Sequence, residues 1–125
     1  MVDDKYLARF VKENVDPMQR ILWNKVGLRE GFTQATAKTT LDIAYWLWSN
    51  GYAFACEVRM KNNLRADIMV PELVNCQVIE IMDSETPSML SRKEKLYDEL
   101  GVSVIGVPAN SSDAIVLIKA VNGLK

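Results

Sequence analysis

Three short apolar segments follow one another through the middle of the chain and restrict its fold more than any other feature. They are residues 53–60, 65–70 and 76–82, and their composition and spacing are typical of strands. The turn 61–63 separates the first two, and a loop after Pro71 separates the second from the third. Connections this short leave no room for a crossover, so we predict an antiparallel meander of three strands.

Helical periodicity covers much of the chain on either side of these strands. Four helices are predicted from apolar stripes and capping residues, at 3–14, 17–28, 33–49 and 87–100. In the third helix we expect these residues to face inward: Ala37, Leu41, Ala44, Tyr45 and Trp48. An apolar strand is predicted at 102–107, and the segment 113–122 fits either a helix or a strand. The order helix, three strands, helix, strand predicts an α/β fold with one mixed sheet.

The composition limits the kinds of protein that this chain can be. It has 125 residues and 49% hydrophobic content, enough for a single domain with a core. A formal net charge of −1 excludes a broadly basic nucleic-acid coat, and the absence of histidine excludes imidazole catalysis and zinc fingers. Two cysteines are too few for a disulfide scaffold. Since no signal-peptide pattern and no bilayer-length apolar run is present, we expect a cytoplasmic, intracellular protein.

Two carboxylates stand inside the apolar strands, where an unpaired charge is costly. Asp67 lies in the second strand and Glu80 in the third, and in-register pairing would bring them together. Glu57 on the first strand can join them. Such oxygens suit Mg²⁺ or Mn²⁺, which can activate water and stabilise charge on a phosphate. The spacing leaves an alternative open, in which Arg59 and Arg65 neutralise the acids as cross-strand pairs.

Four segments of the chain read GYAFACEVRMKNNLRADIMV, CQVIEIM, SRKEKLY and VSVIGVP. Together they resemble the PD-(D/E)XK nuclease superfamily, over about residues 34–108. The resemblance implies the restriction-endonuclease-like fold, a mixed central sheet flanked by helices. The single domain 1–125 then consists of an N-terminal helical extension (1–32), a nuclease-like core (33–108) and a C-terminal element (109–125). The resemblance also implies a metal-dependent nuclease, a hydrolase acting on DNA with Mg²⁺ or Mn²⁺ as cofactor.

The resemblance gives roles to particular residues. The metal-binding acids of the family match Asp67 in RAD and Glu80 in VIEIM. A further acid found in many members matches Glu57 or, as the second choice, Asp42 in the preceding helix. The place of the family's catalytic lysine is held by Met82, which cannot donate to a charged transition state.

Met82 leaves two interpretations open. Either the role of the lysine has moved to Lys93 or Lys95 on the following helix or to Lys61 in the hairpin, or efficient cleavage has been lost. Some branches of the superfamily carry an uncharged residue here and an Arg…Tyr pair on the next helix, which Arg92 and Tyr97 resemble. The predicted catalytic residues are Asp67, Glu80, Lys93 and Lys95, and the predicted nucleic-acid contacts are Lys61, Arg92, Lys95 and Tyr97.

A non-catalytic DNA-binding module is the main alternative function, and a purely structural or interaction protein, which the near-neutral charge favours, is a third possibility. The helices at 17–28 and 33–49 could form a helix-turn-helix, with the hairpin 53–70 as a wing. Clustered acids would favour the nuclease, and scattered acids the regulator. The run 114–121 is more apolar than one outward-packed helix needs, and we expect it to form a homodimer contact.

Overall fold

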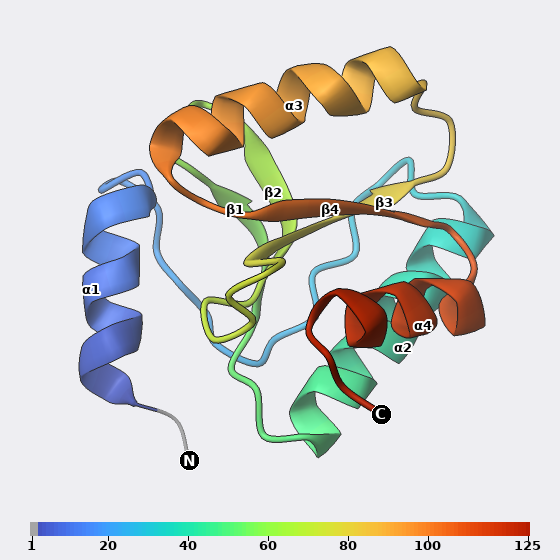
Figure 1. Cartoon of the computed structure of the whole chain (residues 1–125), viewed down its shortest axis with the longest axis horizontal. Helices are drawn as coiled ribbons and strands as arrows, with labels where there is room; N and C mark the ends of the chain where they lie inside the picture. The colour runs from blue at the N-terminus through green and yellow to red at the C-terminus, as the bar shows by residue number, and fades with distance from the viewer. Residues whose placement is uncertain (1–2) are drawn as a thin grey trace.

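The computed structural model describes residues 3–125, which form four helices and one four-stranded sheet. The elements in chain order are α1 (Asp4–Asn14), α2 (Gln34–Ser49), β1 (Ala55–Arg59), β2 (Arg65–Met69), β3 (Val78–Met82), α3 (Pro87–Leu100), β4 (Val104–Pro108) and α4 (Ser111–Val121). Figure 1 shows α3 on one face of the sheet, and α2 beside α4 on the other. No helix in this part of the chain is long and apolar enough to cross a bilayer.

The sheet is mixed, and its strands lie in the order β1-β2-β3-β4. The first three strands pair antiparallel, as their short connections predict, and β4 pairs parallel with β3 after the crossover through α3. The predicted order of helix, three strands, helix and strand is confirmed, and the protein has an α/β fold. The last segment, which the sequence left open between helix and strand, is the helix α4.

Strand alternation divides the core between the two faces of the sheet. Ile79 of β3 belongs to a cluster with Ile118 of α4, on the face that α2 and α4 cover. Val78 of the same strand belongs to a second cluster with Tyr97 of α3. Because Glu80 lies two residues after Val78, its side chain is directed toward α3 rather than toward α2 and α4.

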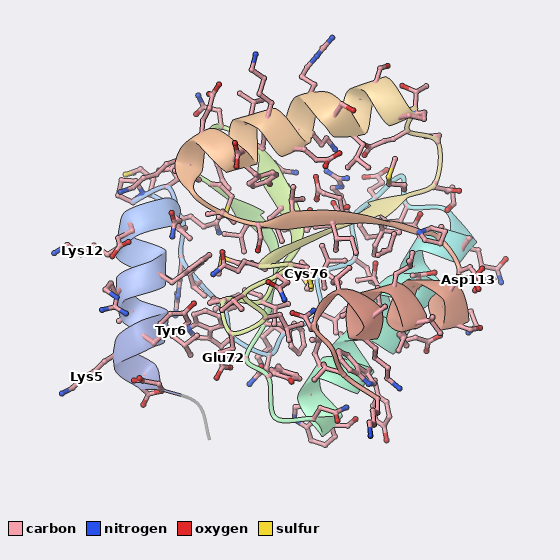
Figure 2. The ribbon with its side chains drawn as sticks, viewed as in Figure 1. Lys5, Tyr6, Lys12, Glu72, Cys76 and Asp113 are labelled. Atoms are coloured by element: carbon pink, nitrogen blue, oxygen red, sulfur yellow. The ribbon has the colours of Figure 1, made fainter. Side chains whose placement is uncertain are left out.

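The helix α1 packs beside the sheet and confirms the prediction for residues 3–14. In Figure 2, Tyr6 points toward the strands, whereas Lys5 and Lys12 point away into solvent. The Tyr6 hydroxyl donates to the carbonyl oxygen of Pro71 at 2.8 Å, and Phe10 is buried against the second cluster. The apolar side of this amphipathic helix is therefore covered by the rest of the chain.

The structure has no helix at 17–28, and this prediction was wrong. The segment instead follows the outer edge of β1. The Asp16 amide donates to the Arg59 carbonyl at 3.0 Å, and the Asn24 amide donates to the Phe54 carbonyl at 2.7 Å. Because β1 is an edge strand, its free backbone groups need partners, and supplying them outweighs the helical periodicity of this segment. The predicted helix-turn-helix therefore lacks its first helix.

The inward face predicted for α2 is only partly correct, since Ala44 is buried but the three largest residues of that prediction are not. Leu41, Tyr45 and Trp48, predicted to face inward, are 45%, 69% and 63% exposed. The buried residues of α2 are Thr39, Thr40, Ile43, Ala44 and Leu47. The helix thus has two apolar stripes, and periodicity alone does not tell which of them faces the core.

Replacing Ile118 by aspartate should unfold the protein rather than alter its assembly. Ile118 is fully buried against the sheet, whereas Val116 on the same helix is 63% exposed. We expect Ile118→Asp to lower the free energy of unfolding by more than about 3 kcal/mol, because it buries an unpaired charge. Val116→Asp, the matched control, should change it by less than about 0.5 kcal/mol. Urea unfolding followed by circular dichroism measures both, and equal effects would contradict this packing.

Candidate functional site

Asp67 and Glu80 face each other across β2 and β3. The two strands are aligned by the pair Ile68–Ile79, and the next position in this register sets Asp67 opposite Glu80. Asp67 is partly buried, and the side chain of Glu80 is only 1% exposed. The convergence that strand alternation predicts for these two acids is confirmed.

Where the backbone pairing of β2 and β3 ends, the two carboxylates accept hydrogen bonds from backbone amides of the opposite strand. The Asp67 amide donates to Oε2 of Glu80 at 3.0 Å, and the Ile81 amide donates to Oδ2 of Asp67 at 2.9 Å. Each acid therefore satisfies a backbone amide of the opposite strand. Charge-assisted bonds of this kind hold both carboxylates in place and leave one oxygen of each for another partner.

Lys93 brings a positive charge to Glu80. Its Nζ is 3.2 Å from Oε1 of Glu80 and 2.8 Å from Oε1 of Glu85. Lys93 lies on the side of α3 that packs on the sheet, so its ammonium reaches the strand from above. The cation beside the buried Glu80 thus comes from α3 and not from the strands.

Gly106 allows α3 to lie this close to the sheet. It pairs with Glu80 in the parallel ladder between β3 and β4. A Cβ atom at Gly106 would lie 2.5 Å from Sδ of Met82 and 2.7 Å from Cδ2 of Leu90. These two side chains cover the glycine, so Met82 has a packing role where α3 crosses the sheet.

Glu57 lies in line with the acid pair but has a partner of its own. The register of β1 and β2 sets Glu57 opposite Asp67. Its φ of 54° is a left-handed value that residues with a side chain rarely adopt. Its Oε1 lies 3.1 Å from Nε of Arg29, whose guanidinium also lies over the ring of Phe32 at 5.3 Å. Glu57 is thus held by an ion pair on the far side of Asp67 from Glu80.

The cations that pair with these acids differ from the ones predicted. Neutralisation by Arg59 and Arg65 was wrong, since Lys93 and Arg29 form the ion pairs. Arg59 instead donates to the carbonyl oxygen of Asn63 at 3.5 Å. No sequence pattern pointed to Arg29, because it lies in the irregular segment before α2, outside any periodic element.

Burial dominates the electrostatics of the site. Desolvation raises the pKa of Glu80 to about 7, and the neighbouring charge of Asp67 adds to this rise. Desolvation also raises the pKa of Asp67 and that of Glu57. Burial by itself would lower the pKa of Lys93, but the hydrogen bond to Glu85 and the charge of Glu80 outweigh burial and raise it. The carboxylates of this site therefore depend on nearby cations for their charge.

Tyr97 lies one helical turn after Lys93 and is completely buried. Its hydroxyl has no hydrogen-bond partner within the described chain. Desolvation raises its pKa, and the charges of Glu80 and Asp67 raise it further, which places the hydroxyl near both acids. It has no exposed atom for the nucleic-acid contact that we predicted.

The other predicted residues lie away from the acid pair. Lys95 is two residues after Lys93, so it leaves α3 in another direction and borders a hollow with Asp98. Lys61 donates from Nζ to the carbonyl oxygen of Lys12 at 2.7 Å. Arg92 is exposed on α3.

Asp42, the second choice for a further acid, also lies outside the site. Its Oδ2 is 2.8 Å from Nζ of Lys38, and it accepts a hydrogen bond from the Ser111 hydroxyl at the start of α4. The hydrogen bond from Lys38 lowers the pKa of Asp42, with a further contribution from Ser111. Asp42 thus connects α2 to α4.

A hollow of about 190 Å³ opens beside Asp67 at the ends of β2 and β3. Its polar lining includes Arg29, Thr33, Thr36, Asp67, Asp83 and Glu85. The hydroxyls of Thr33 and Thr36, at the start of α2, both donate to Oδ2 of Asp83. The hollow gives solvent access to Asp67, whereas Glu80 lies deeper under α3.

Two of the three acids that were predicted to hold a metal ion come together at this site. Among residues 3–125, no group of three or more histidine, cysteine, aspartate or glutamate side chains is arranged to hold a metal ion. The predicted set of Glu57, Asp67 and Glu80 is therefore not assembled, and the last two remain together. Oε1 of Glu80 is buried, and its contact with Lys93 lacks hydrogen-bond geometry. Magnesium keeps several waters and often uses only one or two carboxylates, so this pair suits it.

No protein-family model, no curated protein and no solved structure matches this chain. What the site can do chemically follows from its own residues. Two acids from adjacent strands can hold a divalent ion, and the lysine from α3 can donate to an anionic substrate. The hollow beside Asp67 provides the access that such a reaction needs.

The unfolding free energy should fall as the pH rises from about 4.5 to about 7. In this range folded Glu80, with its pKa raised from 4.5 to about 7, keeps a proton that the unfolded chain has released. The contribution is complete at lower pH and lost at higher pH, and it amounts to on the order of 3 kcal/mol. Asp67 acts in the same direction, because its pKa is also raised.

Urea unfolding at a series of pH values measures this effect. Glu80→Gln should flatten the curve, because glutamine does not titrate, while Glu94→Gln at an exposed position of α3 should leave it unchanged. A Glu80→Gln variant with the slope of the wild type would show that Glu80 is not the group responsible.

Proposed function

We propose that the protein is a metal-dependent nuclease of the PD-(D/E)XK type, hydrolysing phosphodiester bonds in DNA in the cytoplasm. The observation that supports it most is the meeting of Asp67 and Glu80 with the Lys93 ammonium, 3.2 Å from Glu80. Carboxylates buried this deeply need cationic partners. Two acids and a lysine are also the groups that metal-assisted phosphodiester hydrolysis uses.

The order of the elements supports the restriction-endonuclease-like fold as part of the proposal. The helix α2, the meander β1–β3, the helix α3 and the parallel strand β4 follow one another in the order that the resemblance implies. Asp67 is the middle residue of β2, and Glu80 is the middle residue of β3. Both acids that the resemblance selects therefore meet at the centre of the sheet.

Asp67 and Glu80 would hold Mg²⁺ or Mn²⁺. The bound ion would activate a water molecule and neutralise charge on the phosphate. Arg29, half exposed and held by Glu57, lies at the hollow beside Asp67 and would bind a phosphate oxygen there. The exposed residues Lys61, Arg92 and Lys95 would contact the DNA backbone farther from the reacting bond.

Lys93 would have the role that Met82 cannot have. Its ammonium would donate to the charge that develops on the phosphate. Glu85 holds the same ammonium at 2.8 Å, so the lysine is positioned between two acids before substrate binds. Tyr97, buried one turn farther along α3, would position the acids rather than contact DNA.

Lys93→Met should reduce DNA cleavage by roughly a hundredfold to a thousandfold, the usual cost of a lost transition-state donor. Lys95→Met is the matched control. It removes the same charge from another side of α3, so it should weaken DNA binding but leave the rate at saturating DNA close to that of the wild type. The rates are measured on supercoiled, linear, single-stranded and branched DNA, first with Mg²⁺ and then with Mn²⁺.

Adding Met82→Lys to Lys93→Met should recover part of the lost rate, because the ammonium then comes from β3. The proposal fails if the wild type and Met82→Lys are both inert on every DNA form with both metals. A shift of DNA mobility in a gel by such an inert protein would instead support the non-catalytic DNA-binding alternative.

Mn²⁺ should raise the thermal unfolding temperature of the protein, because an ion that binds only the folded chain stabilises it by mass action. Asp67→Asn combined with Glu80→Gln should abolish the increase. Glu57→Gln should retain most of it, since Glu57 is paired with Arg29. A double variant that still responds to Mn²⁺ like the wild type would show that the metal binds elsewhere.

A further inference from the structure

The outer side of α2 carries an apolar stripe that the described chain leaves uncovered. Leu41, Tyr45 and Trp48 follow at helical spacing and are 45%, 69% and 63% exposed. Val26, in the segment before α2, is 40% exposed and borders the same hollow as these three. The rings of Tyr45 and Trp48 are 6.1 Å apart between centroids. We call these four residues the α2 stripe.

The packing of α2 on its own sheet does not require the α2 stripe. Ile43 and Leu47 already anchor the helix, and both are fully buried. The solvent side of a surface helix is normally polar. Tyrosine and tryptophan are enriched at protein interfaces, and a contiguous exposed apolar patch marks a binding surface. The α2 stripe therefore has the composition of an interface that lacks its partner.

Two hollows border the α2 stripe, one on each side of Tyr45, which lines both. One hollow measures about 330 Å³, and its other lining residues are Asn24, Val26, Leu41, Ala44, Trp48 and Phe54. The second measures about 580 Å³, and its other lining residues are Asp42, Trp46, Ser49, Ser111, Ser112 and Ile115. A projecting aromatic ring beside a hollow is a shape that can be complementary to itself.

We propose that a second copy of this chain covers the α2 stripe in a two-fold symmetric homodimer. In such an interface the same patch meets itself, so like charges on the patch would repel. The charged residues of α2 are Lys38 and Asp42, which pair with each other at 2.8 Å. The part of the face that α2 contributes is therefore neutral, and Tyr45 of each copy can enter a hollow of the other.

The charge and extent of the face also favour a second copy over nucleic acid. DNA binding requires several basic side chains along the contact, and α2 has only Lys38, already paired with Asp42. A stable interface covers roughly 800 Å² on each partner. The 16 residues of α2 span about 24 Å, which is the length of helix that such an interface could use.

This interface shares only Ile115, which borders the second hollow, with the dimer contact predicted at 114–121. Ala114 and Ile118 of that run are buried in the core of their own chain. The α2 stripe also does not depend on the proposed nuclease activity. Thr36, which borders the hollow beside Asp67, is 5 residues before Leu41 and 12 residues before Trp48, so the Trp48 end of the stripe lies about 18 Å along the helix from that hollow.

Sedimentation equilibrium of the whole chain tests the proposal. We expect the wild type to be a dimer at about 50 µM, with an unfolding temperature that rises with protein concentration. Trp48→Glu and Tyr45→Lys should weaken the dimer by more than about a hundredfold, since both place charge in the centre of the interface. Val116→Glu is the matched control, because Val116 is 63% exposed, like Trp48, but lies on α4.

A wild type that stays monomeric at about 100 µM, with a concentration-independent unfolding temperature, would overturn the proposal. So would a dimer that survives both α2 substitutions, or one that Val116→Glu dissociates in their place. Far-ultraviolet circular dichroism confirms that each variant is folded, which is expected because all three positions are exposed. Loss of the dimer with unchanged cleavage would separate this inference from the proposed activity.

Discussion

The ion pair between the buried carboxylate of Glu80 and the ammonium of Lys93 ties the sheet to the helix that covers it. A carboxylate with 1% exposure cannot remain charged without a partner at this depth, and the partner has to come from α3. The close approach of α3 in turn requires a residue without a side chain at Gly106. The position of one strand acid thus constrains the helix above it and the strand beside it.

Strand alternation was sufficient to find the acid pair, because side chains alternate between the two faces of a sheet even in strands of five residues. It placed Asp67 and Glu80 together, and the structure confirms this. The choice between Lys93 and Lys95 could also have been made from the sequence. Leu90, Lys93 and Tyr97 are spaced by three and four residues and share one side of α3, whereas Lys95 does not.

The wrong predictions have a common physical origin. In each case the conformation or orientation of a segment depends on other parts of the fold that its own sequence does not show. The segment 17–28 has a helical pattern, yet the unpaired edge of β1 determines its conformation. Which strand is the edge depends on the whole sheet and cannot be read locally. In α2, two apolar stripes compete for the sheet, and Ile43 and Leu47 rather than Tyr45 and Trp48 are buried. Arg29 was missed because it lies in the same irregular segment.

Met82 has a packing role of its own in this structure. Its sulfur and the Leu90 side chain cover Gly106, the residue that lets α3 approach Glu80. A lysine at position 82 would place a charge in this apolar contact. Methionine at position 82 and lysine at position 93 are therefore compatible with each other. Lysine at both positions would be unfavourable, and so would an apolar residue at both. With the cation on α3, the side chain at position 82 of β3 packs against Leu90 over Gly106.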